Sequence, residues 1–421
     1  MLTIIVALAI VAGFLFDIWL DRRQVRFVAA HRDEVPAAFA GRISLEDHRK
    51  AADYTIARQR LGMKRDIAGA ALSMALLAGG GFALLQSTVA AAFGSGAVGS
   101  LALAGALALI FGAVSIPFDY VATFRVEQRF GFNRSTRALF FTDLLKSVVL
   151  TVAFMAPLVL AIDYAARQLG DAWWIAVWVI LVAFNVLALL IVPTFIMPLF
   201  NRFEPLADEG LKARIETLAR RCGFRAKGVF KMDGSKRSGH GNAFFTGIGP
   251  AKRIVLFDTL LETLAPGEVE AVLAHEIGHF RLRHIMKRIL ASLVISLALL
   301  AIAGWLSRQG WFYEGFGLDP AVVSDMPVAG LLLFVLLLPL VSTWFRMIPS
   351  YVSRRHEFEA DAYAAQHSDG KDLASALVKL QRDNAATLTP DPIYAAVNHS
   401  HPTILQRIAK LPVPHSRMRA R

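Results

Sequence analysis

The chain has 421 residues, of which 55% are hydrophobic and 19% are charged, whereas average soluble domains carry about 25% charged residues. This composition argues against a soluble enzyme and excludes a disordered chain. The net charge is +12, but nucleic-acid-binding proteins gather such charge on a polar face and not between long apolar runs. A polytopic membrane protein is therefore expected, and its one cysteine, Cys222, allows no internal disulfide.

Seven apolar segments are predicted to cross a bilayer, which takes a helix of about 20 apolar residues. In the first, at 1–20, the basic residues follow the apolar run, which favours a retained anchor with its N-terminus outside over a signal peptide. Residues 67–118 contain no charged side chain, and the Gly- and Ser-rich stretch 93–100 divides them into two spans. The remaining spans are expected at 147–162, 172–201, 289–307 and 326–345.

Lys and Arg gather in the loops that this arrangement places inside. Residues 22–65 hold eleven of them and the second inside loop holds five, whereas the three outside loops hold none, one and one. The positive-inside rule therefore agrees with all seven spans and explains the basic charge without nucleic acid. The chain divides into a membrane domain at 1–201 with five spans and a second domain at 202–421, which a transmembrane hairpin at about 289–345 interrupts.

The polar segment after the fifth span has the patterns of a small mixed domain. Helices are expected at 208–221 and 258–264, with a further helix opening at Pro266. Short strands are expected at 228–232, 242–247 and 253–257, the last two joined by a Gly-Pro turn.

The helix that opens at Pro266 contains the motif H-E-x-x-H at His275, Glu276 and His279. On a helix, residues four apart lie on one face about 5–6 Å from each other, so both histidines can bind one metal ion. Imidazole nitrogens suit zinc, and a catalytic zinc site keeps one position for water. Glu276 can stand beside that water and remove its proton.

A catalytic zinc needs a third protein ligand, and the candidates lie on a second predicted helix downstream. Glu357 and Asp361 are four residues apart on one face, so one can bind the metal while the other orients a ligand histidine. Glu359 is the competing ligand, but it faces away from Asp361 and is expected to be solvated. Both motifs lie about 15–18 Å along a helix from the sixth and seventh spans, which predicts a site at the inner membrane boundary.

These motifs, in this order, resemble the CAAX prenyl protease 1 family of integral-membrane zinc metalloproteases, the type I CAAX endopeptidases. The resemblance covers nearly the whole chain. Its matching segments are 117–133, 196–206, 241–247, 253–260, the two ligand helices, and Ser400-His-Pro402 with Arg407. It implies an all-α membrane protein whose helices enclose a chamber, with a mainly helical zincin-type peptidase domain, a small β-sheet and one Zn²⁺ per chain.

The resemblance also implies roles for residues that spacing alone does not select. Asn242 and Ala243 match an edge strand that holds the substrate backbone; the alternative is an ordinary hairpin strand. His401 matches a histidine that faces the oxyanion, and Arg407 matches an arginine that supports the oxyanion or the substrate. Without the family, His401 is read as a surface histidine and Arg407 as a solvated charge. The nearby histidines His240, His284 and His356 receive no metal role.

The expected function is zinc-dependent endoproteolysis of membrane-associated, prenylated-like or unfolded polypeptides. The alternatives are an inactive relative that binds membrane clients and a transporter. The partners are then a peptide or protein substrate and the lipid bilayer. The alanine- and arginine-rich composition suggests a bacterial member in the inner membrane, or the ER membrane if the source is eukaryotic, with the active site on the cytoplasmic side.

Overall fold

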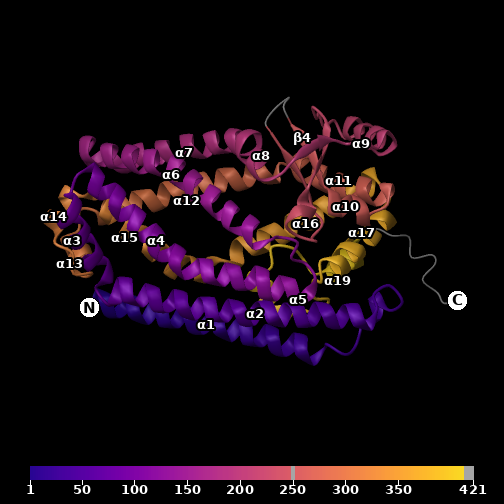
Figure 1. The fold of residues 1–421 in the computed structure, drawn as a ribbon, viewed down its shortest axis with the longest axis horizontal. Helices are drawn as coiled ribbons and strands as arrows, with labels where there is room; N and C mark the ends of the chain where they lie inside the picture. The colour runs from indigo at the N-terminus through magenta and orange to yellow at the C-terminus, as the bar shows by residue number, and fades with distance from the viewer. Residues whose placement is uncertain (248–251, 412–421) are drawn as a thin grey trace.

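The computed structural model describes residues 1–247 and 252–411, and Figure 1 shows an elongated and mostly helical molecule. Long helices run along its length, short helices lie at one end, and the sheet gathers with the polar segments at the other end. The long helices are α1 (Leu2–Ala30), α2 (Leu45–Ser73), α4 (Ala97–Val121), α6 (Arg137–Gln168), α7 (Trp173–Ile191), α12 (His284–Leu306) and α15 (Pro327–Phe345). The predicted all-α membrane architecture with a small sheet is confirmed.

Within the described residues, six helical segments are long and apolar enough to cross a membrane. A seventh results if the bent pair Leu45–Ala78 and Gly81–Phe93 is counted as one span, which agrees with the seven spans expected. Large apolar side chains on these helices point away from the protein, and Leu109, Val152 and Val294 are 60–75% exposed. Exposed apolar surface of this extent requires a bilayer around it.

The connection between the first two spans is much shorter than the predicted loop at 22–65. Helix α1 continues to Ala30 and α2 begins at Leu45, where the hydroxyl of Ser44 accepts a hydrogen bond of 3.0 Å from the backbone N–H of Asp47. Hydropathy detects only the apolar part of a helix, whereas Arg, Lys, Glu and Ala continue the helix into water because their helix propensity is high.

The second span differs from a straight helix. A single π-helical turn at Met74–Ala78 follows α2, and the glycines at 79–81 then turn the chain by 65° into α3 (Gly81–Phe93). Gly80 has φ +72°, a conformation that side chains with a Cβ rarely adopt. The break expected at 93–100 is confirmed, since α3 ends at Phe93 and α4 begins at Ala97.

The polar end carries a four-stranded sheet of order β1-β2-β4-β3. Its strands are β1 (Phe203–Pro205), β2 (Val229–Met232), β3 (Ala243–Thr246) and β4 (Arg253–Phe257). Strands β2 and β4 are parallel, while β3 pairs with β4 antiparallel and forms an edge, with Ala243 opposite Leu256. Strand β1 was not predicted from the sequence, because three residues that end in a proline show no alternating pattern. The expected Gly-Pro turn at 249–250 lies outside the described residues.

Helices lie beside this sheet at the polar end of the molecule, and most of them share one hydrophobic core with it. They are α9 (Glu209–Arg221), α10 (Asp258–Thr263), α11 (Pro266–Arg281), α16 (Met347–His367), α17 (Gly370–Asp383), α18 (Pro392–Asn398) and α19 (Ile404–Lys410). The core joins side chains of α9, β4 and α11, among them Ile215, Leu256 and Ile277, all fully buried. Helix α11 therefore has a fixed position between the sheet and the neighbouring helices. The short helices α5 (Gln128–Phe130), α8 (Met197–Phe200), α13 (Gly310–Glu314) and α14 (Pro320–Asp325) lie in connections.

Candidate metal centre

Helices α11 and α16 carry the two predicted ligand motifs, and they pack closely against each other. A Cβ on Gly278 of α11 would lie 3.2 Å from the Cα of Ala360 and 3.2 Å from the Cβ of Tyr363, both on α16. The absence of a side chain at Gly278 therefore makes room for the second helix. At the start of α11, the Glu268 carboxylate accepts hydrogen bonds from the Ala265 N–H and from α17, which anchors the helix there.

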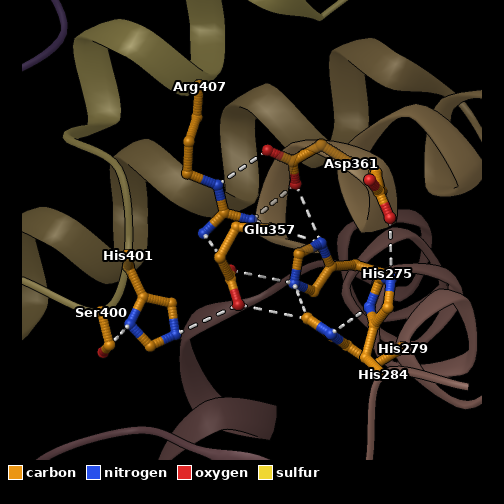
Figure 2. Close-up of polar contacts among 9 residues, drawn as sticks. His275, His279, His284, Glu357, Asp361, Ser400, His401 and Arg407 are labelled. Atoms are coloured by element: carbon orange, nitrogen blue, oxygen red, sulfur yellow. Dashed lines mark hydrogen bonds and ion pairs between the residues drawn. The ribbon is translucent and has the colours of Figure 1, made fainter. Parts of the chain in front are cut away.

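The close packing brings His275, His279 and Glu357 together (Figure 2). The Nε2 atoms of the two histidines are 3.2 Å apart. Glu357 Oε1 lies 3.2 Å from His279 Nε2, and Glu357 Oε2 lies 3.4 Å from His275 Nε2. We call these three residues the donor triangle, because each offers an electron-pair donor atom to a metal ion. All three side chains are at most 15% exposed, so they are largely shielded from solvent.

The dimensions and chemistry of this triangle suit a tetrahedral metal ion. Two ligand atoms bound at 2.0–2.1 Å in a tetrahedron are about 3.3–3.4 Å apart, close to the separations found here. Glu357 Oε2 is buried and accepts no hydrogen bond within the described residues, and the Arg407 guanidinium lies 3.6 Å from it. A metal ion bound between the two histidines would give this oxygen a direct partner. Although burial raises the pKa of Glu357, the neighbouring His275 and His279 hold it well below its usual value, so the carboxylate is ionised.

A second carboxylate orients the first histidine. Asp361 Oδ1 lies 2.9 Å from His275 Nδ1, the ring nitrogen opposite the donor triangle. Arg407, on α19, forms two hydrogen bonds of 2.6 and 2.8 Å with the Asp361 carboxylate and lies 3.6 Å from Glu357. Burial raises the pKa of Asp361, but His275 and Arg407 lower it by more, which keeps the carboxylate charged. Arg407 is therefore a buried partner of Asp361 and not the solvated charge that its sequence context alone predicts.

His401 reaches the same cluster from the loop between α18 and α19. Its Nε2 lies 3.5 Å from Glu357 Oε1, and its Nδ1 lies 3.0 Å from the hydroxyl of Ser400. The side chain is 64% exposed, and it lines a cavity of about 660 Å³ together with Tyr54 and Asn384. His401 thus lies between the donor triangle and this cavity.

Glu276 and the predicted substrate strand complete the set of residues expected from the sequence. Glu276 is half-buried, and its carboxylate makes no hydrogen bond within residues 1–247 and 252–411. Ala243 opens β3 at the sheet edge, and the carbonyl of Asn242 extends its pairing by accepting a 3.0 Å bond from the Phe257 N–H. Strand β3 packs next to α11, so an edge for β-addition lies beside the ligand helix.

Sequence reasoning missed a second group beside the first, formed by His284, His356 and Glu359. His284 Nδ1 lies 3.0 Å from His279 Nδ1, and His284 Nε2 lies 3.0 Å from Glu359 Oε2. Glu359 is therefore bonded to a histidine and only partly solvated. A helix that continued to His284 would not return its side chain to His279, but Arg283 has φ +58° and separates α11 from α12. The only sequence signal was a third histidine five residues after the motif.

Comparisons with known proteins show the family and the fold of the chain. A family model described as the CAAX prenyl protease N-terminal region with five membrane helices matches residues 24–202, and that of peptidase family M48 matches residues 205–414. The chain is 34% identical to CAAX prenyl protease 1 of Saccharomyces cerevisiae, over 95% of this chain and 93% of that protein. It is 33% identical to a homolog from Arabidopsis thaliana, over 94% of each. The crystal structure of S. mikatae Ste24p matches with a TM-score of 0.89 and 32% identity, covering 98% of this chain and 99% of that chain.

Proposed function

The chain belongs to the CAAX prenyl protease 1 family of M48 peptidases and is a multi-pass membrane metalloprotease, and we propose that its metal is a single zinc ion held by His275, His279 and Glu357. The observation that carries the proposal is the buried cluster of these three side chains. The two histidine Nε2 atoms are 3.2 Å apart, and each lies 3.2–3.4 Å from a different oxygen of Glu357, one of which accepts no hydrogen bond in the described residues. Two imidazoles and one carboxylate are a common set for catalytic zinc.

When bound, zinc acts as a Lewis acid on the scissile carbonyl and on water. Glu276 is the general base in this proposal: it takes a proton from the attacking water and transfers it to the leaving amine. His401 donates from Nε2 to the carbonyl oxygen as negative charge develops there. Asp361 fixes the ring of His275, and Arg407 holds Asp361 in place, which supports the ligands. We also propose that Arg407 supports the oxyanion or the substrate.

The substrate is proposed to bind in an extended conformation along Asn242 and Ala243. Backbone hydrogen bonds to a sheet edge give affinity without requiring a particular sequence, and pockets for side chains supply selectivity. The related proteins are named CAAX prenyl proteases. The proposed substrates here are membrane-associated, prenylated-like or unfolded polypeptides, whose ends can reach a site that lies beside the membrane helices.

The orientation in the membrane remains part of the proposal. Met1 lies at the end of the bundle opposite the sheet, and the connection between α1 and α2, which belongs to the basic segment 22–65, lies toward the sheet end (Figure 1). With the positive-inside rule, this supports an N-terminus outside and an active site on the cytoplasmic side. The ranges of the two family models, 24–202 and 205–414, support the proposed division into a membrane domain at 1–201 and a peptidase domain at 202–421 with an inserted hairpin. The relatives cited are eukaryotic, and a bacterial origin with an inner-membrane location stays a prediction.

The proposal is tested on the purified full-length protein in detergent or nanodiscs. We expect about one zinc per chain and cleavage of an internally quenched peptide, both lost on chelation and restored by added zinc. His275→Ala, His279→Ala and Glu357→Ala should lose the metal, whereas Glu359→Ala, which removes the competing ligand, should still hold one zinc when zinc is in excess. Full zinc content in Glu357→Ala, together with its loss in Glu359→Ala, would contradict the ligand assignment.

A further inference from the structure

The group of His284, His356 and Glu359 lies beside the donor triangle, and His284 and Glu359 form hydrogen bonds that packing alone does not require. His284 is fully buried at the start of α12, and both of its ring nitrogens face polar atoms 3.0 Å away. One partner is His279 of the triangle and the other is Glu359, which also accepts a 3.2 Å hydrogen bond from Arg355. A continuous line of hydrogen-bonding groups thus runs from His279 to the surface of α16.

The ring nitrogen that carries the proton in each histidine of this line can be assigned from the orientation of the His279 ring. Its Nε2 faces His275 and Glu357, so a metal ion bound there leaves the proton of the neutral ring on Nδ1. That N–H then donates to His284 Nδ1, which must be unprotonated. His284 consequently carries its proton on Nε2 and donates it to the Glu359 carboxylate. Each N–H in this line then donates to one acceptor, and both hydrogen bonds point from His279 toward Glu359.

The same three residues could be taken for a second metal site, but two observations disfavour it. An ion on His284 Nε2 would move the proton of the neutral ring to Nδ1, where it would face the His279 N–H at 3.0 Å. The rings of His284 and His356 are stacked at 4.0 Å with an interplanar angle of 7°. Because each nitrogen lone pair lies in its own ring plane, one ion cannot be in line with both.

We propose that His284 and Glu359 are positioning residues that orient His279 through a histidine-carboxylate line, in the way that Asp361 orients His275 directly. The inference rests on the proposed function, in which His279 binds zinc. The two ligand histidines then each have a carboxylate from α16 behind them, and both carboxylates lie on the helix that supplies Glu357. Loss of such an outer partner typically weakens metal affinity by about 10–100-fold.

The test is the zinc dissociation constant of the full-length protein, measured by competition with a chelator of known affinity. His284→Phe removes both hydrogen bonds and should weaken zinc binding by about 10–100-fold. His284→Gln should recover a substantial part of the affinity, because its amide oxygen can accept from His279 and its amide N–H can donate to Glu359. Glu359→Ala should weaken binding less, and Glu359→Gln should lie between it and wild type.

His356→Phe is the matched control for packing. His356 stacks on His284, is 8% exposed and makes no hydrogen bond within the described residues, so its replacement should leave zinc affinity near the wild-type value. An unchanged affinity in His284→Phe, or an equal loss in His356→Phe, would overturn the positioning role. Two zinc ions per wild-type chain, one of them lost in Glu359→Ala, would replace it with a second metal site.

These outcomes separate the inference from the proposed function. A wild-type protein that binds no zinc refutes both, whereas a wild-type protein that binds one zinc with an affinity insensitive to His284 and Glu359 refutes the positioning role alone. If His284→Phe fails to fold, the comparison of Glu359→Ala with Glu359→Gln still decides, because the Glu359 side chain is 37% exposed and its loss leaves the core intact. Equal affinity of wild type and Glu359→Ala would then count against the inference.

Discussion

The carboxylate of Glu276 makes no hydrogen bond within the described residues, which suits its proposed role in proton transfer. Glu357 and Asp361 are both held by histidines, whereas the half-buried Glu276 makes no hydrogen bond in the described part of the chain. We expect Glu276→Gln to keep its zinc and to lose about 100–10,000-fold in turnover, since an amide cannot accept the proton. Metal analysis and cleavage of a quenched peptide check this. Near-normal turnover would assign the proton to another group.

His401 is predicted to act on the reaction and not on the metal. Its Nε2 approaches Glu357 from the open side at 3.5 Å, outside the triangle of ligand atoms. A donor to charge that develops only in the transition state affects turnover more than substrate binding. His401→Phe should therefore reduce kcat by about 100–1,000-fold while KM and zinc content stay near wild type.

His399 offers the control for this experiment. It lies two residues from His401, and its ring packs against Tyr394 at 5.7 Å instead of reaching the donor triangle. His399→Phe should keep most of its turnover. Loss of zinc in His401→Phe would make His401 a ligand, and unchanged turnover would return it to the role of a surface histidine.

At the scale of the elements, the site depends on how closely α11 and α16 approach. Gly278→Val would place side-chain atoms where Ala360 and Tyr363 now lie, so the helices must separate or shift. We expect a loss of about 1–3 kcal/mol in stability and weaker zinc binding, because the proposed ligands come from both helices. Gly69→Ala on α2 is the control, since a Cβ there meets nothing within 4 Å. Equal thermal stability and zinc affinity in Gly278→Val would contradict the packing argument.

The ion pair of Asp361 and Arg407 connects α16 to α19. Both side chains are buried, at 5% and 11% exposure, so removing one partner leaves the other charge unpaired. Asp361→Ala is expected to cost about 3–5 kcal/mol in stability and to weaken zinc binding by about 10–100-fold. Thermal unfolding and chelator competition measure the two effects. The double variant Asp361→Ala/Arg407→Ala should lose less stability than the sum of the single variants, and strict additivity would show that the pair is not coupled.

How much of this site the sequence predicts depends on how far apart in the sequence the contacting residues lie. His275, Glu276 and His279 follow from helical spacing, and Glu357 with Asp361 follows from the same spacing on a second helix. His401 comes into the site through a loop 122 positions after His279, and only the family resemblance places it there. His284 needed the positive φ of Arg283, which no residue preference predicts.

The fold shows the same limit. Apolar length located the spans because the bilayer imposes one requirement on all of them, and the ends of α4, α12 and α15 lie within a few residues of the prediction. The continuation of α1 and α2 beyond the apolar runs, and the 65° bend after α2, depend on local propensity and on glycine conformations that hydropathy does not measure.

For the whole molecule, the distribution of charge and of polar structure favours one orientation in the membrane. The sheet, the connection between α1 and α2, and helix α11, which carries two residues of the donor triangle, lie toward one end, and α13, α14 and the N-terminus lie at the other (Figure 1). Basic residues near membrane helices are retained on the cytoplasmic side during insertion. The end that carries the donor triangle is therefore expected inside.

Cysteine labelling in intact cells can measure this orientation, because the natural Cys222 is 3% exposed and should react little. Asp171 lies in the connection between α6 and α7, at the end of the molecule where Met1 lies, and its side chain is 85% exposed, so Asp171→Cys marks that end. Glu34→Cys lies in the exposed connection between α1 and α2 at the other end. An impermeant maleimide should label Asp171→Cys in intact cells and Glu34→Cys only after permeabilisation. Since both sites are exposed, the reverse pattern would mean that the donor triangle faces outward and that its substrates come from the opposite side of the membrane.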